Sequence, residues 1–180
     1  MAKPKVSTDW LGGCAGCHMS LLDMDERIIQ VAELADIRSS PITDLKEPDV
    51  KGVDVGILEG GVTNTTNEEV ALRMRSRCKV LVALGDCAVF GGVPAMRNFF
   101  TLEETLRRGY IETESTDSEG KIPSDPELCV QTKVRALQDV VPVDIFVPGC
   151  PPDADTIFYL LSELAQGRTP IFKDEKLDWH

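Results

Sequence analysis

The sequence predicts a single α/β domain built on a five-stranded parallel sheet. Short runs rich in valine, isoleucine and leucine alternate along the chain with segments of helical periodicity. These runs are apolar throughout, which is typical of strands covered on both faces. A length of 180 residues is enough for one compact hydrophobic core.

Five segments are expected as strands, and glycine, proline or polar turn residues bound each of them. The first leads into a glycine-rich loop, the second ends at Pro41, and the last three end in glycine-containing turns. The expected strands are 6–11, 36–40, 53–58, 79–84 and 143–147.

Helices are expected between and after these strands. Ser20 and Asp23 resemble a capping box, and apolar residues then recur at helical spacing as far as Ala35. Asp153 can cap the last helix, which Gly167 closes. The expected helices are 20–35, about 65–77, 101–108, about 130–138 and 153–167.

The commonest arrangement for such a sheet is a flavodoxin-like three-layer sandwich with strand order 2-1-3-4-5. Residues 1–167 would form this domain and 168–180 a loosely packed tail. The segment 112–127 carries six acidic residues and one lysine, which indicates an acidic surface excursion rather than a core element.

Composition narrows the range of partners. Thirty acidic against nineteen basic residues give a net charge of −11, which disfavours nucleic acid and anionic membrane surfaces. We find no run long enough to span a membrane and no leader-like N-terminus, so we expect a cytoplasmic protein. In that reducing compartment, six cysteines suggest metal ligands or reactive thiols rather than disulfides.

Four of the cysteines follow predicted strands. Cys14 and Cys17 come after the first, Cys87 after the fourth and Cys150 after the fifth. The carboxyl ends of parallel strands share one edge of a sheet, so these thiols can meet there. Four thiolates suit an iron–sulfur cluster or zinc, and the single C-x-x-C alone would also suit a redox dithiol. The wide spacing favours the cluster and leaves a zinc-stapled or redox-sensing module as alternatives.

At these residues the sequence resembles the small subunit of NiFe hydrogenases. The motifs are Trp10-Leu11 followed by C-x-G-C at 14–17, Glu59-Gly60, G-x-C-A-x-x-G-G at 85–92 and P-G-C-P-P at 148–152. The stretch 16–26 is most similar to the short small subunits of soluble, bidirectional NAD-reducing hydrogenases. A related quinone-oxidoreductase subunit is the runner-up, because it carries adjacent cysteines where this chain has C-x-x-C.

The resemblance implies a specific function. Cys14, Cys17, Cys87 and Cys150 would ligate one [4Fe–4S] cluster. The NiFe centre would lie on a large-subunit partner, and electrons would pass to diaphorase subunits that hold flavin and further iron–sulfur clusters and reduce NAD. Since larger members of the family continue into a domain with two more clusters, we expect only one here.

Several other residues have two interpretations. Cys78 is expected to be a buried small side chain and Cys129 a non-ligand. His18 either donates to the cluster or is satisfied locally, and Glu59 either relays protons or shapes an interface, or is a plain capping or solvated carboxylate. The segment 63–66 suggests a phosphate site for a second FMN, although helix capping explains it better.

Overall fold

The computed structural model describes residues 2–172 and contains the expected parallel sheet. Its five strands lie in the order β2-β1-β3-β5-β7, which is the predicted spatial order of the five expected strands. The strands are β1 (Lys5–Trp10), β2 (Asp36–Ser39), β3 (Val53–Glu59), β5 (Cys78–Leu84) and β7 (Ile145–Val147).

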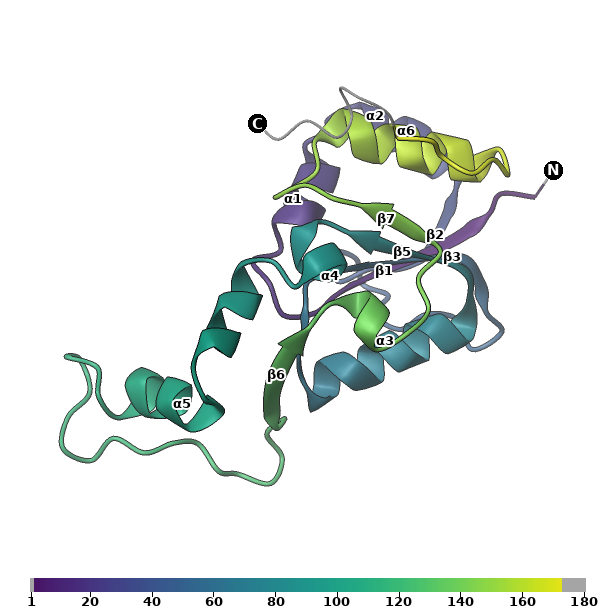
Figure 1. Cartoon of the computed structure of the whole chain (residues 1–180). Coiled ribbons are helices and arrows are strands. Elements are labelled where there is room, and N and C mark those ends of the chain that lie inside the picture. Colours follow the sequence, from purple (N-terminus) through teal and green to yellow (C-terminus); the bar gives the residue numbers. More distant parts are fainter. Residues whose placement is uncertain (1, 173–180) are drawn as a thin grey trace.

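Helices cover both faces of the sheet (Figure 1). On one face, α1, α2 and α6 pack over a core that includes Leu21, Val31 and Leu160. On the other, α3 and α4 pack over a second core that includes Met74 and Val89. The helices are α1 (Gly16–Leu22), α2 (Arg27–Leu34), α3 (Thr65–Arg77), α4 (Asp86–Phe90), α5 (Leu102–Tyr110) and α6 (Ala154–Ala165).

The strand register aligns the carboxyl ends of four neighbouring strands. Trp10 lies opposite Glu59, Glu59 opposite Leu84, and Leu84 opposite Val147. The loops that follow β1, β3, β5 and β7 therefore all begin on one line across the sheet.

The helix expected over 20–35 is divided into α1 and α2. Asp25 has a positive φ of 51°, which a continuous helix does not allow. Ser20 lies inside α1 instead of capping it, and its hydroxyl donates to the Pro152 carbonyl. The apolar positions still face the core, because Met24 in the break is buried together with Leu21 and Val31.

The prediction of a helix over 130–138 is wrong. This segment forms β6 (Gln131–Arg135) and a 3-10 turn, η2 (Leu137–Asp139). β6 pairs antiparallel with β4 (Val62–Asn64), a strand that the sequence did not reveal. On the other side, the Asn98 side chain accepts from Val134 N at 2.9 Å and donates to Val134 O at 2.8 Å. Residues distant in sequence thus supply the hydrogen bonds to these backbone groups that a helix would have supplied locally.

The other helix ends follow sequence signals. The Asn64 side chain, rather than Thr65 or Thr66, caps α3 by accepting from Asn67 N at 2.8 Å. Thr101 forms a capping box with Glu104 at the start of α5. Asp153 caps α6 as predicted, by accepting from Thr156 N at 2.7 Å.

The α5 region projects from the body as an arm (Figure 1). It follows η1 (Val93–Phe99), and the acidic segment 112–127 beyond it contains no helix or strand. At the other end of the chain, Pro170 is buried and the Phe172 ring stands edge-on to Tyr159 at 5.9 Å. The remainder of the expected tail, 173–180, lies outside the described residues.

Within residues 2–172, none of the helices combines the length and apolar character that a membrane span requires.

The Asn98–Val134 contact predicts a measurable loss of stability. Asn98→Ala leaves both backbone groups of Val134 without these bonds and should lower the free energy of unfolding by about 1–3 kcal/mol. Urea unfolding measures the change. Met96→Ala, an exposed position in the same turn η1, is the control and should change it by less than about 0.5 kcal/mol. Equal stability of the Asn98 variant and the wild type would contradict the assignment.

Candidate functional site

The four candidate cysteines lie in the loops that leave the aligned strand ends. Cys14 and Cys17 follow β1, and Cys17 lies in the first turn of α1. Cys87 lies in α4, two residues after the turn from β5, and Cys150 follows β7. The structure thus brings all four predicted residues to the same edge of the sheet.

Backbone hydrogen bonds join the loops of β5 and β7. Gly85 N donates to Val147 O at 2.7 Å, and Asp86 N donates to Gly149 O at 2.9 Å. The buried Asp86 carboxylate accepts in turn from Gly149 N at 2.7 Å. Asp86 therefore fixes the Cys87 loop against the Cys150 loop, a role that the sequence analysis did not assign to it. In the sequence, the only sign of this role is that Asp86 directly precedes Cys87.

The loop of β1 is held in a similar way. Gly12 and Gly61 exchange two backbone hydrogen bonds, each of 2.9 Å. An added Cβ on Gly12 would come within 2.2 Å of the Thr63 side chain, so glycine is required at this close approach.

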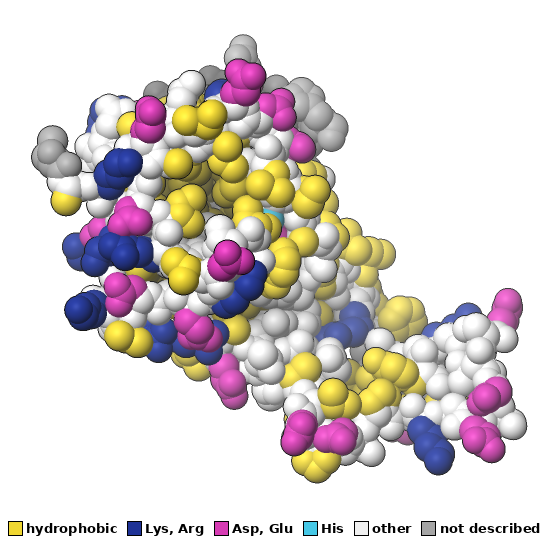
Figure 2. Space-filling view, turned by 180° about the vertical axis from the view of Figure 1, so that it is seen from behind, with side chains coloured by type: hydrophobic (Ala, Val, Ile, Leu, Met, Phe, Trp, Pro, Cys, Tyr) yellow, Lys and Arg dark blue, Asp and Glu magenta, His cyan; other side chains and the backbone are white. Residues whose placement is uncertain are grey.

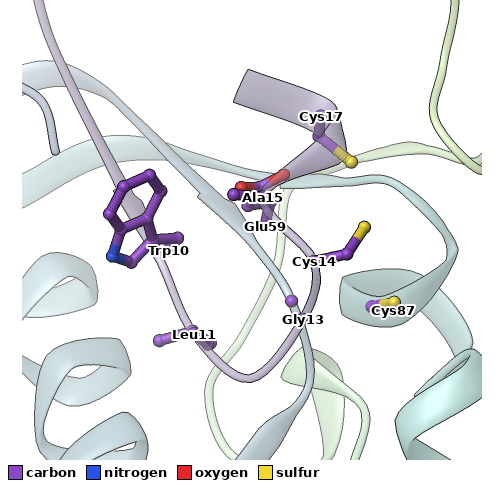
Figure 3. Close-up of a pocket in the computed structure, with 9 residues that line it drawn as sticks. Trp10, Leu11, Gly13, Cys14, Ala15, Cys17, Glu59 and Cys87 are labelled. Carbon is purple, nitrogen blue, oxygen red and sulfur yellow. The ribbon is translucent and has the colours of Figure 1, made fainter. Parts of the chain in front are cut away.

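A pocket of about 150 Å³ opens between these loops. Figure 3 shows the sulfur atoms of Cys14, Cys17 and Cys87 along one side of it. Cys150 does not line this pocket, but its thiol is close enough to Cys87 to affect its pKa. The pocket is lined by Trp10, Leu11, Gly13, Cys14, Ala15, Cys17, Glu59, Gly60 and Cys87.

Glycines leave room for the thiols. An added Cβ on Gly85 would lie 2.3 Å from the Cys17 sulfur, and one on Gly92 would lie 2.9 Å from the Cys87 sulfur. Gly85 also has φ 83° and ψ 161°, a conformation essentially restricted to glycine. These glycines thus serve both the backbone path and the space that the sulfur atoms occupy.

Burial raises the pKa of the Cys17 thiol, and Glu59 and the neighbouring thiols raise it further. Burial also raises the pKa of Cys87, with contributions from Cys150 and Cys14. A metal cation stabilises thiolates in such a site, because it supplies the missing positive charge.

Zinc needs its ligands gathered around one ion, with Zn–S distances of about 2.3 Å. In the part of the chain that the structure describes, we find no group of three or more histidine, cysteine or acidic side chains placed to hold one ion. In a [4Fe–4S] cluster, by contrast, each thiolate binds its own iron.

A row of buried polar side chains lies behind Cys17. His18 Nδ1 is 2.8 Å from Glu59 Oε1, and His18 Nε2 is 2.9 Å from the Thr8 hydroxyl. Thr8 in turn donates to Ser40 Oγ at 2.7 Å. His18 is thus satisfied locally, by Glu59 and Thr8. Glu59 is only 3% exposed, which excludes the solvated alternative.

Burial opposes ionisation of Glu59, but hydrogen bonds from His18 and Cys17 together with the charge of His18 hold its pKa below the usual value. Glu59 also accepts from His18 N at 3.3 Å in the first turn of α1. The carboxylate is therefore kept ionised, and it anchors the helix that carries Cys17.

The remaining candidates lie elsewhere. Cys78 is buried at the start of β5, as predicted. Cys129 lines a separate groove beside α5. In the 63–66 segment, Asn64 caps α3 and the Thr63 hydroxyl donates to Asn67 Oδ1 at 2.8 Å, which supports the capping interpretation over a flavin phosphate site.

Similar sequences and folds occur in known proteins. Residues 14–164 match the family described as NADH ubiquinone oxidoreductase, 20 Kd subunit, and the chain belongs to it. Within it, the chain is a member of the small-subunit family of NiFe hydrogenases, as the following relatives show.

The chain is 41% identical to the delta subunit of the NAD-reducing hydrogenase HoxS of Cupriavidus necator, over 92% of this chain and 80% of that protein. It is also 41% identical to a subunit of the F420-non-reducing hydrogenase of Methanothermobacter thermautotrophicus, over 92% of this chain but only 54% of that protein. The chain thus spans about half the length of the F420-non-reducing relatives.

A crystal structure of an NAD+-reducing NiFe hydrogenase in the H2-reduced state contains a similar chain. The TM-score is 0.94 at 38% identity, and the match covers 99% of this chain and all of that one. The NiFeSe hydrogenase of Desulfovibrio vulgaris Hildenborough, with a TM-score of 0.60 and 17% identity, shares the fold; there the match covers 92% of this chain and 60% of that one.

The glycine at the end of β5 generates a prediction. Gly85→Ala should destabilise the protein on the order of 2 kcal/mol, because alanine is strained at this φ and ψ. Its Cβ also collides with the Cys17 sulfur. Gly109→Ala in α5 is the matched control: apart from its neighbours and the backbone of its own helix, no atom lies within 4 Å of its added Cβ, and alanine should stabilise the helix by up to about 1 kcal/mol. Equal free energies of unfolding for Gly85→Ala and the wild type would refute this account of the turn.

Proposed function

We propose that this chain binds one [4Fe–4S] cluster through Cys14, Cys17, Cys87 and Cys150. As the electron-transfer subunit of a cytoplasmic NiFe hydrogenase, it would carry electrons between a NiFe site on a large-subunit partner and a diaphorase module that reduces NAD. The observation that carries the proposal is the alignment of the strand ends, which brings the loops of these four cysteines together.

The residues present suit the cluster. Thiolates are the ligands of [4Fe–4S] clusters, and the glycine turns leave the space beside the sulfur atoms free of side chains. When bound, such a cluster takes up and releases one electron at a time. Cys17 and Cys87 are half-buried and would hold its inner side, whereas Cys14 and Cys150 are exposed and would hold its outer side.

The catalytic metal belongs on a partner in this proposal. A NiFe centre needs four cysteine ligands of its own, and only Cys78 and Cys129 remain here. These two residues are not placed to ligate a NiFe centre, because Cys78 is buried at the start of β5 and Cys129 lies beside the α5 arm. The proposal does not include a flavin on this chain, since the polar groups of 63–66 are engaged in capping α3.

NAD rather than another acceptor is supported by the relatives that this chain matches over most of their length. These are the HoxS delta subunit and the chain of the NAD+-reducing enzyme. Assaying hydrogen-dependent reduction of NAD by the native complex tests this part of the proposal. A complex that oxidises hydrogen without reducing NAD would favour the type to which the F420-non-reducing relatives belong.

An exposed apolar surface next to the site supports a protein partner. It starts at Phe90, close behind Cys87, and continues along η1, where Phe99 is 85% exposed. Apolar patches of this kind mark interfaces. Figure 2 shows hydrophobic side chains over the middle of one face of the molecule and again on the arm. We assign to the large-subunit interface the surface made of Phe90, Val93, Met96, Phe99 and Phe100.

Metal analysis tests the ligand assignment. The protein purified without oxygen should contain about four irons per chain and absorb broadly near 400 nm. Cys150→Ala should lose the cluster, whereas Cys78→Ala should keep it, because Cys78 is buried at the start of β5, away from the cysteine loops. A Cys150 variant with the full cluster spectrum would remove Cys150 from the site.

Co-purification tests the partner surface. Phe99→Asp should abolish recovery of a nickel-containing chain while the iron content of this chain stays unchanged, since the charge disrupts an apolar contact outside the cluster loops. Ile29→Asp, an exposed apolar position on α2, is the control and should co-purify normally. Normal recovery with Phe99→Asp would place the large subunit elsewhere.

A further inference from the structure

The buried side chains in the row behind Cys17 are not among the proposed cluster ligands. It runs from Glu59 at the end of β3, through His18 in α1 and Thr8 in β1, to Ser40 after β2. All four residues are less than 5% exposed. The row therefore connects the loop of the first two candidate ligands to the edge of the sheet.

Glu59 is the end of this row that faces the pocket. Its carboxylate accepts hydrogen bonds from His18 Nδ1 at 2.8 Å, from His18 N at 3.3 Å and from the Cys17 thiol. It also lines the same pocket as Cys14, Cys17 and Cys87. A buried carboxylate thus lies directly against the place where thiolates would gather.

The electrostatics of that arrangement are unfavourable without a compensating group. A buried charge is tolerated only when it is paired and hydrogen-bonded. Cys17 loses its proton when it binds a metal, and its bond to Glu59 is lost with it. Among the residues that the structure describes, the His18 ring is then the only side chain that still donates to this carboxylate, beside the backbone N–H groups of Cys17 and His18.

The orientation of His18 is fixed from both ends. The Thr8 hydroxyl donates to Ser40, so its oxygen is free to accept from His18 Nε2. The ring also stands edge-on to Trp10, with the centroids 5.6 Å apart. The imidazole can therefore neither turn away from Glu59 nor reach the pocket that the thiols line.

From this geometry we propose that His18 is a positioning residue for the cluster. It compensates the charge of Glu59 and, through Glu59, holds the first turn of α1 and Cys17 in place for ligation. This inference rests on the proposed function, since it concerns how the site keeps its cluster.

Three variants separate this role from simple packing against Trp10. His18→Leu fills similar space but cannot donate to Glu59. His18→Gln retains a donor. The double variant His18→Leu/Glu59→Gln removes the carboxylate charge together with its partner, and so tests whether the effect of His18→Leu depends on that charge.

The readouts are the rate at which an iron chelator bleaches the absorbance near 400 nm and the midpoint potential followed by electron paramagnetic resonance. His18→Leu should lose its cluster roughly 10-fold faster than the wild type, the lower end of what lost outer ligand contacts cost. Its potential should become more negative, because an uncompensated carboxylate favours the oxidised cluster. His18→Gln and the double variant should both lie close to the wild type.

The double variant decides the outcome even when His18→Leu retains too little cluster to measure. Recovery in the double variant supports charge compensation, whereas equal loss in both would overturn the inference in favour of packing. A His18→Leu protein with wild-type rate and potential would also overturn it, with the four-cysteine assignment intact. A wild-type chain that takes up no iron would overturn the inference and the proposed function together.

Discussion

The alignment of four parallel strand ends is the constraint on which the rest of this molecule depends. Trp10, Glu59, Leu84 and Val147 lie side by side across the sheet. A slip of one residue in any pairing would move the side chains of that strand to the opposite face of the sheet and displace the loop that follows it. The two buried cores, one on each face, prevent such a slip, because every strand between them has apolar side chains that must remain inside. The precision of the site is therefore a consequence of core packing.

The loops built on this line are joined by polar groups rather than by apolar contacts. Asp86 connects the Cys87 loop to Gly149, and Ser20 connects α1 to Pro152. Glu59 and His18 connect α1 to the strands beneath it. Buried groups of this kind are costly when unpaired, so they specify one arrangement of the loops.

The distribution of exposed apolar residues indicates that the chain works as part of a larger assembly. Cys17 and Cys87 are half-buried, Cys14 and Cys150 are exposed, and an apolar surface that contains Phe90 and Phe99 begins close behind Cys87. In the proposed function, a partner that covers the exposed side would also keep water away from the cluster. The projecting α5 arm extends the molecule beyond this surface (Figure 1).

The sequence alone determined the parallel sheet, its strand order and the meeting of four cysteine loops, because those features follow from local apolar runs and from the geometry of parallel strands. It also determined the cap at Asp153, where the capping group lies within three residues of its partner. Only the tertiary structure decided that 131–135 is a strand, that 20–35 is broken at Asp25 and that His18 meets Glu59. Each of these depends on partners tens of residues away or on packing against the sheet, and local periodicity contains no information about them.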